Sequence, residues 1–299
     1  MNCTSGVNWV PEGFQHAMQN KANSSNHTLR IGGRLINLVR PLVMGIINTT
    51  PDSFYFKSRH SDVEEVLRTA EQMINEGADV LDIGGYSSRP GAAEVSAETE
   101  LSRVIPAIDA IHRRFPEIPL SLDTFRSAIA VAGLEAGASV INDITAGTGD
   151  PDMFRTVAEF DAAMVIMHTR GTPATMSTLT KYDHVTREVA SYLQERIKMA
   201  ESQGVKELIV DPGFGFAKTR QQNFDLLRNL DHFQICNRPV LAGFSRKSMI
   251  WKTLSIEPEN ALNGTTALNM AALMKGASIL RVHDVKAAKE CVTLFCEMN

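Results

Sequence analysis

The sequence lacks the features that would place it in a membrane, nucleic-acid-binding or zinc-binding class. No apolar run approaches the about 18 residues that a membrane-spanning helix requires. No long basic run marks a general nucleic-acid or anionic-membrane surface, and 30 basic against 34 acidic residues leave a formal net charge of −4. The eight histidines show neither HxH nor HExxH spacing, so a zinc site is not indicated. We therefore expect small-molecule substrates, with neither nucleic acid nor membrane as a partner.

Cysteine is scarce and without a redox or metal pattern. Cys3, Cys236, Cys291 and Cys296 include no CxxC pair, and the last two are five residues apart in a predicted helix, which turns them to different faces. Reduced thiols and a cytoplasmic location are expected, because the first residues also lack a basic segment followed by an apolar one. Residues 1–27 are polar without sustained periodicity, and we expect a flexible N-terminal extension there.

From residue 28 onward, short β-branched runs alternate with amphipathic segments. TLRIGGRLINL (28–38) predicts a short β-hairpin around Gly32 and Gly33. Eight strands are predicted after it, at 42–47, 79–83, 119–123, 139–144, 162–168, 207–211, 239–244 and 278–282. This pattern predicts an α/β fold, a TIM (β/α)8 barrel over residues 28–299 with a short N-terminal β-hairpin. A doubly wound open sheet is the competing architecture, but no supporting GxGxxG follows the first strand.

The segments between the strands have helical periodicity. Apolar residues in 63–77 and 183–204 follow the three-and-four spacing of one helix face. GADVL (77–81), GASVI (137–141) and GASIL (276–280) join helix ends to strands, with Gly at the position where φ is often positive. Internal repetition and convergent use of a common loop explain the similarity of these three segments equally well.

Polar side chains recur where the predicted strands end, which is where TIM barrels place their chemistry. Any one of them is explained as a cap or a satisfied core polar group. Their recurrence is harder to explain by stability, because buried polar groups cost free energy unless they are paired. The set comprises Asn48, Asp82, Asp123, Asn142, Asp143, His168, Asp211, Ser245, Arg246, Lys247, Arg281 and His283.

The first two loops combine turn residues with anion-binding donors. MGIINTTPDSF (44–54) turns Asn48 into the predicted barrel mouth, either in an Asx-type turn or in a metal- or phosphate-facing loop. GGYSSRPG (84–91) has glycines that allow backbone approach to an anion, with Ser88 and Arg89 as donors. A loop of this composition is weak evidence by itself.

The later loops add groups suited to a flat heterocycle and an anion. In DPGFGF, Asp211 is able to accept two parallel hydrogen bonds from an amidine-like edge, and Phe216 is able to stack on a ring. Lys247 and Ser248 fall at a predicted helix start, which favours a carboxylate or phosphate. Arg281 and His283 are two residues apart on one strand, so both point the same way.

Together these motifs resemble the dihydropteroate synthase family over roughly residues 30–299. The resemblance rests on MGIINTTPDSF, GGYSSRPG, Asp123, INDI (141–144), DPGFGF, SRKS (245–248) and RVHD (281–284), in this order and spacing. It implies a transferase of folate synthesis that condenses 6-hydroxymethyl-7,8-dihydropterin diphosphate with 4-aminobenzoate, giving 7,8-dihydropteroate and diphosphate. It also implies a homodimer, because family members usually form one.

The resemblance further implies a role for each matched residue. Asn48 would bind Mg²⁺, which shields the diphosphate. The catalytic residues would be Asp123, Lys247, Arg281 and His283. Pterin would be held by Asp123, Asn142, Asp211 and Lys247, with Arg281 stacked over it. The diphosphate would contact Ser88, Arg89 and His283, and 4-aminobenzoate would contact Pro90, Phe216 and Ser248. Diphosphate departure is expected to precede attack of the arylamine, with Asp123 stabilising the cationic pterin and no covalent enzyme nucleophile.

The sequence departs from the family pattern at three places. DSFYFKSRH (52–60) replaces a Ser-Asp-Gly-Gly segment, Tyr86 stands where Glu is frequent, and Ala217 stands where Gly is frequent. All three flank substrate loops and bear on discrimination between 4-aminobenzoate and sulfonamide inhibitors. Two alternative functions remain, a corrinoid-dependent pterin methyltransferase barrel and a pterin-binding paralogue without turnover.

Overall fold

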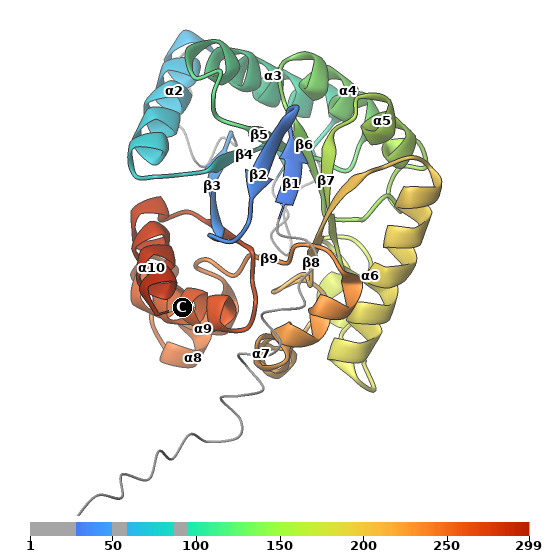
Figure 1. The fold of residues 1–299 in the computed structure, drawn as a ribbon, viewed down its shortest axis with the longest axis vertical. Coiled ribbons are helices and arrows are strands. Elements are labelled where there is room, and N and C mark those ends of the chain that lie inside the picture. Colours follow the sequence, from blue (N-terminus) through green and yellow to red (C-terminus); the bar gives the residue numbers. More distant parts are fainter. Residues whose placement is uncertain (1–27, 50–58, 87–94, 299) are drawn as a thin grey trace, which may run out of the picture.

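A computed structural model describes residues 28–49, 59–86 and 95–298, and within them the chain forms a barrel of parallel strands surrounded by helices (Figure 1). This arrangement confirms the predicted TIM barrel. The predicted extension at 1–27 lies outside the described residues. The barrel strands are β3 (Leu42–Asn48), β4 (Val80–Gly84), β5 (Leu120–Asp123), β6 (Val140–Asp143), β7 (Ala163–Met167), β8 (Glu207–Asp211), β9 (Leu241–Ala242) and β10 (Ile279–Val282).

The strands pair in the order β8-β7-β6-β5-β4-β3-β10-β9, and a parallel bridge between Val210 and Val240 closes the ring. The strand predicted at 239–244 is reduced to the two residues of β9. The ladder is irregular there, because the Val240 carbonyl accepts from the N–H groups of both Ser278 (2.8 Å) and Ile279 (3.1 Å). The other predicted strands agree with the structure to within about two residues at either end, as expected for boundary assignments.

The helices form the outer ring of the barrel (Figure 1). Outward-facing strand residues such as Leu81 and Ile83 are fully buried against helix side chains such as Ile108 and Leu193. This burial is the main apolar contribution to the fold. The helices are α2 (Arg59–Asn75), α3 (Ala97–Arg114), α4 (Ser127–Glu135), α5 (Met153–Glu159), α6 (Val185–Ser202), α7 (Arg220–Arg228), α8 (Ser248–Leu254), α9 (Leu262–Met274) and α10 (Val285–Glu297). Three short 3₁₀ segments are η2 (Met176–Thr178), η3 (Leu230–Cys236) and η4 (Pro258–Asn260).

Several local predictions are confirmed by backbone geometry and burial. Gly77, Gly137 and Gly276 have φ of +99°, +115° and +89° after their helices, which is the left-handed conformation that glycine adopts without strain. In α10, Cys291 is buried and Cys296 is exposed, and both are free thiols. None of the helices in the described part of the chain has the length and apolar character needed to cross a membrane.

The predicted hairpin, β1 (Thr28–Ile31) and β2 (Arg34–Asn37), covers the amino-terminal end of the barrel (Figure 1). Leu29 and Ile31 are buried in one cluster with inward-facing residues from the starts of the strands, such as Val80 and Ile209. The Arg30 guanidinium pairs with Asp161 at 2.6 Å, outside this cluster. The hairpin therefore fills the amino-terminal half of the barrel with apolar side chains.

We expect Ile31→Ala to lower the free energy of unfolding by about 2–4 kcal/mol, because it leaves a cavity in this cluster. Leu35→Ala in β2 is the matched control, since its side chain is 71% exposed, and it should change stability by less than about 0.5 kcal/mol. Urea unfolding followed by circular dichroism measures both. Equal losses in the two variants would show that the hairpin does not close the barrel as described.

Candidate active site

The described residues of the predicted site lie at the carboxyl-terminal end of the barrel. Side chains alternate along each strand, so in β10 Leu280 and Val282 pack outward against helices while Arg281 faces the barrel interior. The same alternation turns these residues inward at the ends of their strands: Asn48, Asp82, Asp123, Asn142 and Asp211. Ser88, Arg89, Pro90 and residues 52–58 of the divergent first loop lie outside the described residues.

The guanidinium of Arg281 joins three strands at the barrel mouth. Its Nε donates to Asp82 Oδ2 at 2.6 Å, and its Nη2 donates to Asp123 Oδ2 at 2.7 Å. Asn142 Nδ2 donates to the same Asp82 oxygen at 3.2 Å. Asp123, Asn142 and Arg281 are therefore brought together as predicted. Asp82, which the sequence marks only as a strand-end carboxylate, lies at the centre of the group.

Asp123 has an unusual protonation equilibrium for a carboxylate. Burial raises its pKa to about 7, the positive charge of Arg281 opposes this shift, and the negative charge of Asp82 adds to it. Two further carboxylates, Glu100 and Asp143, act in the same direction as Asp82. The charge on Asp123 therefore changes near neutral pH.

A second pair of opposite charges is formed by Asp211 and Lys247. Asp211 Oδ1 accepts from the Gly213 N–H at 2.7 Å, and burial raises the pKa of Asp211 while Lys247 opposes the shift. The Lys247 ammonium donates to the Phe214 carbonyl and lies 4.7 Å from the centre of the Phe216 ring. Burial lowers the pKa of Lys247 to about 8. The arrangement places a carboxylate, an ammonium and an aromatic face beside one another.

His283 and Ser248 are the remaining predicted site residues that the structure describes at the barrel mouth. Ser245 Oγ accepts from the His283 backbone N–H at 3.2 Å and lies 3.1 Å from His283 Nδ1, which orients the imidazole. Ser248 is exposed and begins α8, directly after Lys247.

Asn48 is the one predicted metal ligand that the structure describes. It ends β3 and is half-buried, next to Thr49, whose N–H and hydroxyl both donate to the Gly84 carbonyl. No cluster of three His, Cys, Asp or Glu able to hold a metal occurs among the described residues. An amide oxygen alone fits Mg²⁺ only where water and phosphate oxygens supply the other ligands, as is usual for this ion. The residues present therefore fit a substrate-bound Mg²⁺.

The comparisons with known proteins agree with this geometry. The profile of the family described as pterin binding enzyme matches residues 44–283. Dihydropteroate synthase of Escherichia coli (strain K12) is 43% identical over 262 residues, which are 87% of this chain and 92% of that protein. The chain belongs to the dihydropteroate synthase family.

Two solved structures of a relative extend the comparison. Dihydropteroate synthase of Xanthomonas albilineans with 4-aminobenzoic acid is 40% identical and superposes with a TM-score of 0.85, covering 92% of this chain and 98% of that one. The same enzyme in complex with 7,8-dihydropteroate is 39% identical, with a TM-score of 0.82 and coverage of 91% and 98%. The family resemblance of the sequence motifs is thus confirmed over most of the chain.

One group beneath the DPGFGF loop was not assigned a role from the family motifs. Lys218 Nζ donates to the carbonyls of Gly213 (2.9 Å) and Phe216 (3.0 Å) and lies 3.0 Å from His168 Nδ1. Burial lowers the pKa of Lys218 to about 7, and burial together with the charge of Lys218 keeps the pKa of His168 far below its usual range. The pair ties the loop that carries Asp211 and Phe216 to the end of β7. A Lys two residues after the DPGFGF motif is the sequence signal for it.

The departure at Ala217 has a structural compensation. Ala217 has φ of +48°, a left-handed conformation that explains why Gly is frequent there in the family. Its carbonyl accepts from the Tyr182 hydroxyl at 3.0 Å, and the Arg170 guanidinium lies 3.8 Å from the centre of the Tyr182 ring. These contacts hold the strained residue in place from the neighbouring loop.

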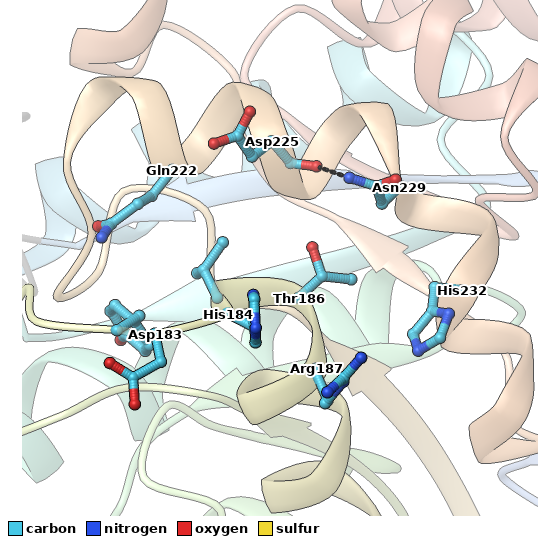
Figure 2. Close-up of a pocket in the computed structure, with 10 residues that line it drawn as sticks. Asp183, His184, Thr186, Arg187, Gln222, Asp225, Asn229 and His232 are labelled. Atoms are coloured by element: carbon cyan, nitrogen blue, oxygen red, sulfur yellow. Dashed lines mark hydrogen bonds between the residues drawn. The ribbon is translucent and has the colours of Figure 1, made fainter.

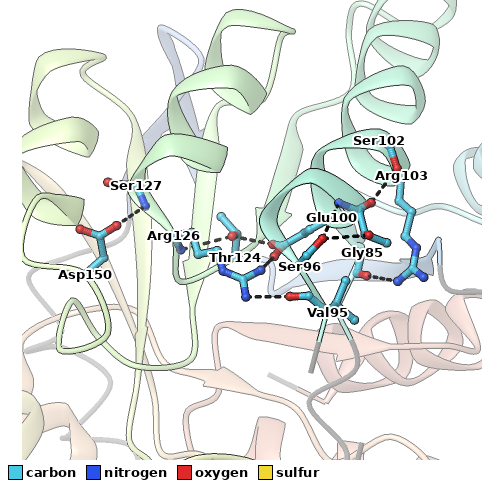
Figure 3. A network of polar contacts seen from close by, with 11 residues as sticks. Gly85, Val95, Ser96, Glu100, Ser102, Arg103, Thr124, Arg126, Ser127 and Asp150 are labelled. Atoms are coloured by element: carbon cyan, nitrogen blue, oxygen red, sulfur yellow. Dashed lines mark hydrogen bonds and ion pairs between the residues drawn. The ribbon is translucent and has the colours of Figure 1, made fainter. Parts of the chain in front are cut away.

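The departure at Tyr86 lies beside a polar network, shown in Figure 3, that joins the segment after β5 to α3. The Tyr86 ring contacts Phe125 edge-on, with 5.4 Å between centroids. The Arg126 guanidinium lies 5.0 Å from the centre of the Phe125 ring and pairs with Glu100, a fully buried carboxylate that also accepts from the Thr124 hydroxyl at 2.7 Å. Ring contacts thus hold Tyr86, and Arg126 also donates to the Val95 carbonyl at 2.8 Å.

A separate groove of about 530 Å³ lies outside the barrel, between the start of α6 and α7 (Figure 2). His184, Arg187 and His232 line it from different elements. None of the predicted site residues lines it. The candidate active site is therefore assigned from the converging side chains at the barrel mouth and not from this concavity.

We expect Asp123→Asn to change the pH dependence of stability. The folded-state pKa of Asp123 is about 7 against 3.8 ordinarily, so ionising it costs the native protein stability progressively between about pH 4 and pH 7. The variant avoids this cost, and its unfolding midpoint relative to wild type should therefore rise from pH 5 to pH 8. Thermal unfolding at several pH values measures the difference. A difference independent of pH would contradict the assigned ionisation.

Proposed function

We propose that this protein is a dihydropteroate synthase, a transferase that joins 4-aminobenzoate to 6-hydroxymethyl-7,8-dihydropterin diphosphate and releases diphosphate. The observation that supports it most is the barrel mouth, where Asp123, Asn142, Asp211, Lys247 and Arg281 converge from five separate strand ends. The family to which the chain belongs is defined by this reaction. A homodimer and a cytoplasmic location form part of the proposal.

Pterin recognition follows from the hydrogen-bonding capacity of the buried side chains. The pyrimidine edge of a pterin presents adjacent N–H donors, and Asp211 is a buried acceptor with one oxygen already held by the Gly213 N–H. Each carboxylate oxygen is able to accept more than one hydrogen bond, so Asp211 still has an acceptor site on both oxygens for the two adjacent N–H groups of the substrate. Asn142 and Lys247 supply an amide and an ammonium for the remaining ring atoms. Arg281 covers the ring with its planar guanidinium.

Catalysis in this proposal is the separation of a cationic pterin from an anionic leaving group. Asp123, when ionised, stabilises the pterin-methyl cation that forms as the carbon–oxygen bond to diphosphate breaks. His283, Ser88 and Arg89 bind the diphosphate oxygens. Mg²⁺, when bound with Asn48 as its protein ligand, supplies charge neutralisation to the diphosphate.

The second substrate then attacks the cationic carbon. The amine of 4-aminobenzoate forms the new carbon–nitrogen bond and loses a proton, so no enzyme nucleophile is consumed. Phe216 offers a ring face, and Pro90 and Ser248 complete this part of the site. The contact between Phe216 and Lys247 keeps the two substrate sites adjacent.

The deciding experiment supplies pterin diphosphate, 4-aminobenzoate and Mg²⁺ to the purified protein and measures diphosphate and dihydropteroate together. Equal amounts of both products are expected. Binding of pterin diphosphate by calorimetry without product would favour the non-catalytic paralogue. Methyl transfer from a methylated tetrahydropterin to a corrinoid would favour the methyltransferase.

We expect Asp211→Ala to weaken pterin binding by roughly 30- to 100-fold, because the pterin N–H groups lose a buried charged acceptor. Asp231→Ala, at an exposed carboxylate of η3 that pairs with Lys275, is the matched control and should bind normally. Calorimetry with the pterin substrate measures both affinities. Unchanged affinity in Asp211→Ala would refute the proposed edge recognition.

We expect Asn48→Ala to raise the Mg²⁺ concentration needed for half-maximal turnover by roughly tenfold or more, since the ion loses its protein ligand. Binding of a pterin without the diphosphate group should be unaffected, which separates metal binding from damage to the barrel mouth. A Mg²⁺ titration of the rate, after chelation of bound metal, provides the measurement. An identical Mg²⁺ requirement in both proteins would remove Asn48 from the metal site.

A further inference from the structure

We propose that Asp82 is a positioning residue of this reaction, which holds Arg281 and Asn142 at the pterin site while Asp123 is left to exchange its contact with Arg281 for the substrate. The inference rests on the proposed function. It assigns a role to a buried carboxylate that the recognition and chemistry described above do not use. The contacts of Asp82 with two substrate-binding side chains are the starting observation.

A single oxygen of Asp82 organises both neighbours. Asp82 Oδ2 accepts from Arg281 Nε at 2.6 Å and from Asn142 Nδ2 at 3.2 Å, and Arg281 Nη2 lies 2.6 Å away as well. These three residues belong to β4, β10 and β6, so their backbones are held by the barrel. The positions of the guanidinium and the amide are therefore set by one common acceptor.

The two carboxylates that contact Arg281 differ in their access to a ligand. The side chain of Asp82 is completely buried, whereas those of Asp123 and Arg281 are 17% and 20% exposed. A ligand entering the barrel mouth is able to reach Asp123 and the guanidinium, but not Asp82. Substrate binding can therefore replace the contact between Asp123 and Arg281, while the contact between Asp82 and Arg281 persists.

The other oxygen of Asp82 makes this buried carboxylate more dependent on the positive charge of Arg281. Asp82 Oδ1 is buried and has no hydrogen-bond partner among the described residues. A buried carboxylate without a counter-charge is strongly unfavourable, so Asp82 and Arg281 stabilise each other as a pair. The two side chains are accordingly expected to behave as one unit when either is altered.

Asp82 also affects the ionisation of Asp123. The charged groups that act on Asp123 are Asp82 on β4, Glu100 on α3, Asp143 on β6, Arg281 on β10 and Lys247 at the start of α8. The negative charge of Asp82 raises the pKa of Asp123, and Arg281 lowers it. When the charge of Asp82 is removed, Asp123 is the one charged carboxylate still in contact with Arg281. The pKa of Asp123 should therefore fall.

The test is a double-mutant cycle of Asp82→Asn and Arg281→Met, measured as kcat/KM for pterin diphosphate. Asp82→Asn should lower kcat/KM by about tenfold or more, because Arg281 is released. In the Arg281→Met protein, Asp82→Asn should lower kcat/KM by less than about threefold, because the guanidinium that Asp82 positions is already absent. Additive losses would show that Asp82 does not act through Arg281 and would overturn the proposal.

The pH profile supplies a readout that a merely structural defect would not move. With ionised Asp123 as the active form, the acidic limb of kcat/KM should shift to lower pH in Asp82→Asn. Ser121→Ala is the matched control, since Ser121 pairs with Asp82 across β4 and β5, and its buried hydroxyl has no hydrogen-bond partner among the described residues. It should leave both the rate and the limb unchanged. If the acidic limb of the kcat/KM profile lies at the same pH in Asp82→Asn as in the wild type, the proposal is contradicted.

Unfolding midpoints keep the test decisive if a variant is inactive. Arg281→Met leaves two carboxylates without a counter-charge, so it should destabilise the wild-type protein more than the Asp82→Asn protein. Equal destabilisation in the two backgrounds would overturn the pairing. Wild-type turnover in the same assay tests the proposed function separately, so a failure of the synthase activity is distinguishable from a failure of the Asp82 proposal.

Discussion

The guanidinium of Arg281 contacts both Asp82 and Asp123 at the mouth of the barrel, and the arrangement of the site depends on it. Without Arg281, no positively charged side chain among the described residues would pair with either carboxylate. Burial of like charges raises the free energy of the native state, so this ion cluster constrains both stability and reactivity. Burial raises the pKa of Asp123 to near neutrality, with the negative charge of Asp82 adding to this shift and the positive charge of Arg281 opposing it.

The barrel divides its interior into an apolar and a polar half. Below, Leu29 and Ile31 of the hairpin fill the space between the strand starts. At the carboxyl-terminal end, the inward-facing positions two residues later on four of these strands carry charged or amide side chains, namely Asp82, Asn142, Asp211 and Arg281. Because the apolar half is packed, the polar groups have fixed backbones, and their charges are able to act on a substrate without reorganising.

The loop after β8 is supported by a second buried basic side chain, that of Lys218. Lys218 holds the carbonyls of Gly213 and Phe216 from below, while Lys247 reaches the same loop from α8. The strained Ala217 is tolerated because Tyr182 binds its carbonyl. The departure from the family pattern at Ala217 is thus compensated by neighbouring side chains, and Asp211 and Phe216 remain in place in the loop.

Local sequence patterns are sufficient to predict the barrel, the hairpin and most of the inward-facing polar residues. Period-two alternation, β-branched runs and glycine at helix ends are local signals, and the strand-end residues follow from them. The short β9 was not predictable, because its length depends on the irregular bonding at Val240 with a strand distant in the sequence. Only the tertiary structure decided that Arg281 pairs with Asp82 and Asp123, which are 199 and 158 residues away in the chain. It likewise decided that Lys218 lies beneath the loop, since burial and ion pairing arise from the closure of the barrel and not from local spacing.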